Sequence, residues 1–328
     1  QGLEQGLSQK HAVAQRVRDL GGAVEAVHPG GYLLQAAMDA ATLTEVVAMD
    51  EVAWIDPWGP GETDMDLARQ IGGADYVEGQ AGFDGTGVRG EVFDDGFWKT
   101  HQEVQVNPLI DHNLVLNGWH GANTSGAVFS SGVNPMARGM LPNGQGIVSS
   151  FTGLGDRVAH SHDLINAPFF AVFQTNSWGD PRTTQYTSKS QEIDLIIFET
   201  DLIITQSQSN AGNQDSRPQA WGKNSVAVGG VKHMNTLSKP DDNWTFGASI
   251  GPAADGRIKP DLTHFYDNIF TTTNSGNASY STNFGGTSGA TPIVAGHFGL
   301  FFQMWHTGIF GNATGASVFD SRPHSTTA

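Results

Sequence analysis

One stretch near the end of the chain limits what the sequence can fold into: the run GGTSGATP at residues 285–292. An apolar run, residues 293–302, follows it directly. Two glycines permit a tight turn, and a helix-capable segment begins only after them. We therefore predict that Ser288 lies at or just before the N-terminus of a helix. Pro292 would then lie in the first turn, where a helix tolerates proline.

A serine at such a position is either a helix N-cap or a nucleophile. The N-cap is the common case, and it requires nothing else from the chain. A nucleophile would benefit from the free backbone N–H groups and the positive end of the helix dipole, because both favour a developing negative charge. The residues upstream decide between the two.

The composition limits the class of function. The 328 residues include 17 Lys and Arg against 33 Asp and Glu, a formal net charge of −16. This charge repels phosphate, so neither nucleic acid nor an anionic membrane is expected as a partner. The chain has no cysteine, which excludes disulfides and thiolate chemistry. We recognise no signal peptide, and the longest nearly apolar run, residues 293–305, is too short to span a bilayer.

The sequence predicts two domains joined by a linker at residues 58–63. Residues 1–57 read as helix, strand, strand, helix, strand, which lacks only a leading strand of a ferredoxin-like α+β domain. Residues 64–328 alternate short strands with helical segments. This alternation predicts a doubly wound α/β domain, with a mainly parallel sheet covered by helices on both faces. Polar residues just past the strands would then lie at the ligand-binding edge.

Three polar residues precede Ser288 at predicted element boundaries. Asp94 ends a strand, His120 opens a segment of small residues, and Asn213 follows an apolar strand. Taken singly, each has a structural explanation: an Asp-Gly turn, a solvated histidine or an Asn-Gly turn. Taken together, an acid, an imidazole and a hydroxyl in that order match the requirements of acyl transfer through an activated serine. An Asn amide can donate to an oxyanion without titrating, and Asn210 is a rival for that role.

Four segments resemble the signature blocks of the subtilisin-like serine proteases. They are residues 92–96, 120–126, 211–213 and 286–292. Two weaker segments agree, since residues 175–179 resemble the strand that pairs with substrate and residues 224–230 resemble the strand after the oxyanion loop. The resemblance covers about residues 64–310. Residues 1–57 are similar to the propeptide-type domain that precedes such catalytic domains.

The resemblance implies a serine endopeptidase. Ser288 would attack the scissile carbonyl, His120 would carry the proton to the leaving amine, and Asp94 would orient the imidazole. The oxyanion hole would consist of the Asn213 amide and the backbone N–H of Ser288. The residues expected to bind an extended substrate or to line its specificity pocket are Ser177, Trp178, Gly179, Asn210, Ala211 and Gly212.

The resemblance also implies partners and a location. Peptide or protein substrates are expected, with the N-terminal domain as an intramolecular inhibitor and folding chaperone, and the family suggests secretion. The chemistry needs no cofactor. Family members often carry structural calcium, and Glu103 lies at a frequent ligand position, but no Asp-rich loop identifies a metal site. Because 40 residues follow Ser288, the C-terminal part is expected to be short for the family.

Three residues depart from the family pattern. Asp95 adds a second carboxylate beside Asp94, and the alternation of side chains along a strand predicts that it points elsewhere. Asn123 replaces the second histidine of its block, and Gly289 replaces the usual methionine after the serine.

Two alternatives use the same residues. The domain could be a latent or non-catalytic peptide-binding form whose cleft residues 1–57 block. It could also be a transpeptidase or macrocyclase, which forms the same acyl-enzyme but excludes water. An α/β-hydrolase is set aside because Ala290 breaks the G-x-S-x-G motif and the order of acid, base and nucleophile is reversed.

Overall fold

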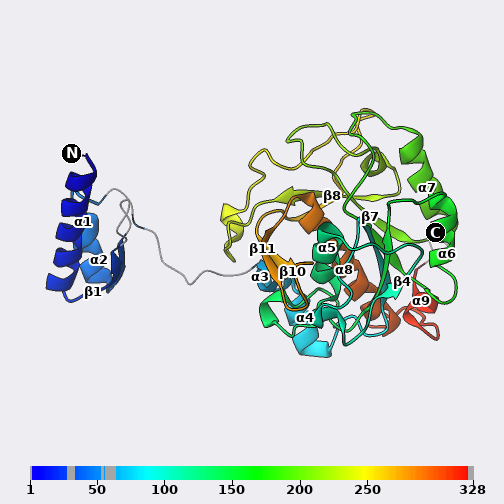
Figure 1. The fold of residues 1–328 in the computed structure, drawn as a ribbon, viewed down its shortest axis with the longest axis horizontal. Coiled ribbons are helices and arrows are strands. Elements are labelled where there is room, and N and C mark those ends of the chain that lie inside the picture. The colour runs from blue at the N-terminus through cyan, green and yellow to red at the C-terminus, as the bar shows by residue number, and fades with distance from the viewer. Residues whose placement is uncertain (1, 28–33, 53–54, 56–63, 324–328) are drawn as a thin grey trace. The chain divides into compact units, whose positions relative to one another are not determined.

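A seven-stranded parallel sheet organises the larger part of the chain (Figure 1). The computed structural model describes residues 2–27, 34–52, 55 and 64–323. The chain divides into two units, Gln1–Glu62 and Thr63–Ala328, and each is described by itself. The predicted linker, residues 58–63, lies outside the described residues.

The first unit is a small α+β unit. Its elements are α1 (Gly2–Asp19), β1 (Ala23–Val27), β2 (Leu34–Ala37) and α2 (Ala40–Val47), with the two strands antiparallel. Val13, Val17 and Val46 form its buried core. Asp39 is the N-cap of α2 as predicted, because its carboxylate accepts a hydrogen bond from Thr42 N at 2.8 Å. Two strands are fewer than a ferredoxin-like sheet has, so the described part of this unit does not show the predicted topology.

The second unit confirms the predicted parallel α/β architecture. Its sheet has the order β4-β5-β3-β6-β7-β8-β9, and every neighbouring pair is parallel. The strands are β3 (Arg89–Asp94), β4 (Ile110–Asp111), β5 (Gln145–Ser150), β6 (Phe173–Asn176), β7 (Ile203–Ser207), β8 (Val226–Val231) and β9 (Leu262–Phe265). The chain passes from β5 across β3 to β6, so the strand order reverses between β3 and β6. Ligand sites of open parallel sheets lie at the carboxyl ends of the strands at such a switch point.

Helices cover both faces of this sheet. The α-helices of the unit are α3 (Asp64–Gly72), α4 (Ala74–Ala81), α5 (Trp119–Phe129), α6 (Arg157–Leu164), α7 (Ser188–Thr200), α8 (Thr287–His306) and α9 (Val318–Ser321). Short 3₁₀ helices are η1 (Gln102–Val104), η2 (Pro135–Ala137), η3 (Pro218–Trp221) and η4 (Lys239–Asp241), and a hairpin of β10 (Ile269–Thr272) and β11 (Tyr280–Phe284) leads into α8. No helix in the described part of the chain is both long and apolar enough to cross a membrane.

Neighbouring residues of one strand show how the two faces are filled. In β5, Ile147 packs in a cluster with α6 and α7, whereas Val148 packs in the cluster that contains residues of α5 and α8. Side chains alternate between the faces of a strand, so the two helix pairs cover opposite sides of the sheet. In Figure 1, α5 and α8 lie near the middle of this unit and α6 and α7 lie together at its right edge.

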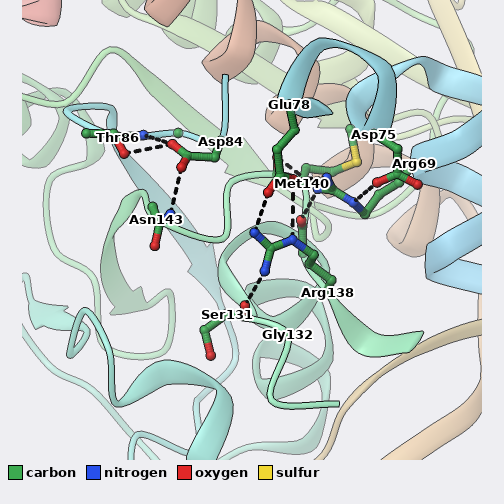
Figure 2. A network of polar contacts seen from close by, with 12 residues as sticks. Arg69, Asp75, Glu78, Asp84, Thr86, Ser131, Gly132, Arg138, Met140 and Asn143 are labelled. Carbon is green, nitrogen blue, oxygen red and sulfur yellow. Dashed lines mark hydrogen bonds and ion pairs between the residues drawn. The ribbon is translucent and has the colours of Figure 1, made fainter. Parts of the chain in front are cut away.

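A buried arginine joins α3 and α4 to the loop after α5 (Figure 2). Arg69 of α3 is 2% exposed, and its Nε donates to Asp75 Oδ1 at 2.6 Å. Its two terminal nitrogens donate to Glu78 of α4 and to the backbone carbonyl of Gly139. Arg138 also donates to Glu78. The two guanidinium groups and two acids therefore form one connected network.

We predict that Arg69→Met lowers the free energy of unfolding of this unit by about 2 kcal/mol or more. The substitution leaves Asp75 and Glu78 without their buried cation, although the partial exposure of both acids keeps the loss below the about 3–5 kcal/mol of a fully buried pair. Lys99→Met is the control, because Lys99 and Asp111 form an exposed pair, whose loss costs about 1 kcal/mol or less. Denaturant titration of both variants tests this, and equal losses would contradict it.

Candidate active site

The carboxylate of Asp94 lies at the end of β3 and is 1% exposed. Its Oδ1 accepts from His120 Nδ1 at 2.7 Å, and its Oδ2 accepts from Thr124 Oγ1 at 3.0 Å. His120 and Thr124 are one turn apart on α5, so they present their side chains to the same partner. Donation from Nδ1 leaves the lone pair of the His120 ring on Nε2. The predicted acid and imidazole are therefore brought together, and Thr124 is a partner that the sequence motifs did not identify.

Glycine is what lets α5 approach the end of β3. A Cβ on Gly121 would lie 2.1 Å from the carbonyl oxygen of Gly96 and 3.1 Å from Asp94 Cβ. No side chain fits at these distances. The small residues after His120 thus serve the close packing that the sequence predicted.

Strand alternation predicted that Asp95 points away from this region, but its side chain points to α5. Strand β3 ends at Asp94, and Asp95 Oδ1 accepts from the backbone N–H of Gly121 at 2.9 Å. The acid thereby takes the place of a side-chain cap for α5, whose N-cap residue is Gly118. Burial lowers the pKa of His120, but the charge and hydrogen bond of Asp94 and the charge of Asp95 raise it by more, so the net effect is a pKa above the ordinary histidine value.

Ser288 is the second residue of α8, close to the predicted position. The turn before it places Gly286 at φ 74°, where glycine is favoured. Helix α8 begins at Thr287, so Pro292 is its sixth residue and lies beyond the first turn, contrary to the prediction. Because proline has no N–H, it cannot donate to the carbonyl of Ser288.

Ser177 donates to that carbonyl instead. Its Oγ lies 3.0 Å from the carbonyl oxygen of Ser288, and Ser288 Oγ in turn donates to the carbonyl oxygen of Ser177 at 3.2 Å. Ser177 directly follows β6, one of the two strands at the switch point. This exchange of two hydrogen bonds places the N-terminus of α8 at the carboxyl edge of the sheet.

The two candidate amides lie in different surroundings. Asn210 Oδ1 accepts from Thr287 N at 2.9 Å and from Thr287 Oγ1 at 3.1 Å, so its side chain lies against the residue before Ser288. Asn213 Oδ1 accepts from Asp215 N at 2.7 Å, within its own loop. Ser209, at φ 112°, turns the chain between β7 and Asn210. Of the two residues, the structure brings Asn210 to the serine turn.

The other predicted substrate-binding residues line the same edge of the sheet or support it. The ring of Trp178 stacks on Phe151 with centroids 4.5 Å apart. A Cβ on Gly179 would lie 2.8 Å from Gln219 Oε1. The N–H of Ala211 donates to Ser249 Oγ, and Gly212 lies directly against the carbonyl oxygen of Phe246.

Two aromatic residues flank His120 that the sequence motifs did not identify. Phe284, the last residue of β11, has its ring centroid 5.5 Å from that of His120 and 5.6 Å from that of Trp119. Trp119 is 46% exposed. An exposed aromatic ring next to the imidazole gives this side of the site an apolar surface that a substrate side chain can contact.

Glu103 is surrounded by hydrogen-bond donors. Its carboxylate accepts from the backbone N–H groups of Gly132, Val133 and Asn134 at 2.7–3.0 Å, and from Tyr280 OH at 2.7 Å. A calcium ion requires oxygen ligands around it, and N–H groups do not supply them. These contacts make Glu103 the anchor of the 132–134 loop, and structural calcium stays a prediction without assigned ligands.

Comparisons with known proteins agree with this architecture. A model of the subtilase family matches residues 92–309. The solved structure of the Prenylagaramide maturation protease PagA superposes with a TM-score of 0.58 at 16% identity, over 75% of this chain and 84% of that chain. No curated protein sequence matches the chain.

Two further structures are similar. A cold adapted subtilisin-like serine proteinase superposes with a TM-score of 0.51 at 20% identity, over 69% of this chain and 78% of that chain. The Patellamide maturation protease PatG superposes with a TM-score of 0.58 at 14% identity, over 74% of this chain and 84% of that chain. At these identities the likeness shows a shared fold.

We predict that Asp95→Asn lowers the pKa of His120. The asparagine oxygen can still accept from Gly121 N, so the variant removes the negative charge and keeps the hydrogen bond. An imidazolium that loses a neighbouring negative charge deprotonates at lower pH. Titration of the histidine ring signals by NMR measures the change, with Asp111→Asn as the charge-matched control. An unchanged or higher pKa of His120 in Asp95→Asn would show that Asp95 does not act on the ring.

Proposed function

The chain belongs to the subtilase family, and from this premise we propose that it is a serine endopeptidase acting through an acyl-enzyme on Ser288. The observation that carries the proposal is the 2.7 Å hydrogen bond between the buried Asp94 carboxylate and His120 Nδ1. It leaves His120 Nε2 as a base, in a domain whose α8 presents a serine at its N-terminus.

In the proposed reaction His120 Nε2 takes the proton of Ser288 Oγ as that oxygen attacks the scissile carbonyl. Ser288 Oγ donates to Ser177 O in the structure, so the reaction requires it to exchange this acceptor for Nε2. The imidazolium then gives the proton to the leaving amine, and water attacks the acyl-enzyme by the same route. Because His120 must be neutral at the start, its raised pKa moves the acidic limb of activity to higher pH than an unperturbed histidine would give.

We propose Asn210 as the side-chain donor to the oxyanion, in place of Asn213. The support is its anchoring: with Oδ1 held by both the N–H and the hydroxyl of Thr287, the amide plane is fixed beside the serine turn. A donor fixed before the reaction needs no reorganisation as the oxyanion forms. The backbone N–H of Ser288, at the start of α8, would be the second donor.

The substrate is proposed to be an extended peptide that pairs with residues 177–179 by main-chain hydrogen bonds. The first unit is proposed to act as an intramolecular inhibitor and chaperone, and the protein to be secreted. The support for the substrate, for the role of the first unit and for secretion is the resemblance to the family. In that family, domains similar to the first unit precede the catalytic domain.

We expect a fluorophosphonate probe to label the full chain on Ser288 and not to label Ser288→Ala. An activated serine hydroxyl reacts with such a probe, whereas an ordinary serine does not.

Digestion of casein, read by mass spectrometry, then gives the cut sites. Products heavier by one water indicate hydrolysis, and products joined without water indicate transpeptidation. A wild-type chain that stays unlabelled would contradict an active protease and favour the latent form.

We predict that Asn210→Ala lowers kcat by about 10²–10³, the size known for removal of one oxyanion donor in a subtilisin. Asn213→Ala is the matched control and should change kcat by less than about threefold, because its side chain oxygen serves only its own loop among the described contacts. Steady-state kinetics on a peptide substrate compare the two variants. The reverse order of effects would restore Asn213 as the donor.

A further inference from the structure

A second polar cluster lies in the sheet domain, and the proposed mechanism does not use it. Glu91, His112 and His160 are 0%, 1% and 4% exposed. Glu91 belongs to β3, three residues before Asp94, whereas His112 directly follows β4 and His160 lies in α6. A carboxylate buried in the central part of a sheet is costly unless its charge is matched, so this cluster calls for an explanation.

The three side chains converge on a small volume. His112 Nδ1 lies 2.7 Å from Glu91 Oε1, and His160 Nε2 lies 3.1 Å from both oxygens of Glu91. One ligand atom from each residue lies within 4.8 Å of the other two. Two imidazole nitrogens and one carboxylate oxygen are a donor set that zinc and neighbouring divalent metals prefer.

The outer nitrogen of each ring also has a partner. His112 Nε2 lies 3.2 Å from Asp163 Oδ2, and His160 Nδ1 lies 2.8 Å from the carboxamide of Asn113. Histidines that bind metals usually donate the other ring N–H to a carboxylate or carbonyl oxygen, which turns the free lone pair toward the metal. Asp163 supplies such an oxygen, and a half-turn of the Asn113 amide supplies another. Gln174 Nε2 holds the second oxygen of Glu91 at 2.8 Å.

A surface pocket leads to the cluster. It has a volume of about 570 Å³, and its lining includes Asn113, His160 and Asp163 together with the loop before α6. His160 is the member of the cluster that lines this pocket, so water in the pocket would be available to an ion bound to that ring.

We propose that Glu91, His112 and His160 form a binding site for one divalent transition metal ion, with zinc as the first choice. The ion would tie together three segments: β3, the residue after β4, and α6. This site is independent of the proposed protease chemistry and adds a structural function to it.

The site has a direct connection to the substrate-binding segment. The ring of Phe93 stacks on His160 at 4.6 Å and meets the ring of Trp178 edge-on at 5.2 Å. Arg157, in the first turn of α6, lies over the same Trp178 ring at 5.1 Å. An ion that fixes α6 against β3 would therefore fix the aromatic support of Trp178.

Hydrogen bonds alone are the other explanation for the cluster. In that case the three side chains hold one another without a metal. The two explanations differ in whether the folded chain binds zinc with a defined stoichiometry, and this is what the experiment measures.

The test uses the full-length Ser288→Ala chain, so that proteolysis cannot affect the result. After dialysis against a chelator, Zn²⁺ is added back, its stoichiometry is measured by elemental analysis, and unfolding is followed on heating. We expect one Zn²⁺ per chain and a rise in Tm of about 5 °C at a hundredfold excess over Kd. Co²⁺ at the same site should give visible d–d absorption.

Variants locate the ion. Glu91→Gln should lose the Zn²⁺, and Asp163→Ala should bind it about 10–100-fold more weakly; the latter residue is 58% exposed, so its loss does not threaten folding. His162→Ala is the matched control, because it removes an exposed histidine of the same helix that pairs with Glu199. An undiminished Zn²⁺ affinity in Asp163→Ala, or an affinity that falls as far in His162→Ala, would overturn the proposal. So would a folded Ser288→Ala chain that binds no Zn²⁺.

Discussion

The buried carboxylate of Asp94 is the group on which the candidate site depends. It lies at the end of a central strand, where its charge must be met by donors, and α5 supplies two of them from one face. That arrangement works only because the helix backbone comes within van der Waals contact of the strand end at Gly121. Asp94 thus fixes the orientation of the His120 ring, and Gly121 lets α5 come close enough to β3 for this hydrogen bond to form.

The switch point of the sheet places the acid and the residue that holds the serine at the ends of neighbouring strands. Asp94 ends β3 and Ser177 follows β6, and these are the two strands between which the strand order reverses. Ser177 holds the first turn of α8 through both of its hydrogen bonds to Ser288. A proline that cannot donate is what leaves the carbonyl of Ser288 free for this role.

Sequence reasoning identified the architecture and the boundary residues, because strands, small-residue helices and glycine turns have local signals. It did not identify what depends on the path of a loop. Spacing alone does not show which of Asn210 and Asn213 lies at the serine turn. The chain turns at Ser209, and the Asn210 amide then lies against Thr287. The predicted direction of the Asp95 side chain was wrong because β3 ends at Asp94, so the alternation along the strand does not extend to Asp95. The cluster around Glu91 joins segments that are too far apart in sequence to form a motif.

The network around Arg69 has a consequence for any shortening of the chain from its N-terminus. Helix α3 follows the first unit closely in sequence, yet its arginine neutralises acids of α4 and holds a carbonyl beyond η2. A polypeptide truncated past Leu67 would begin inside this network and lose the helix that carries the guanidinium. A truncation that keeps the sheet domain intact therefore has to end before α3, because that helix carries the buried cation.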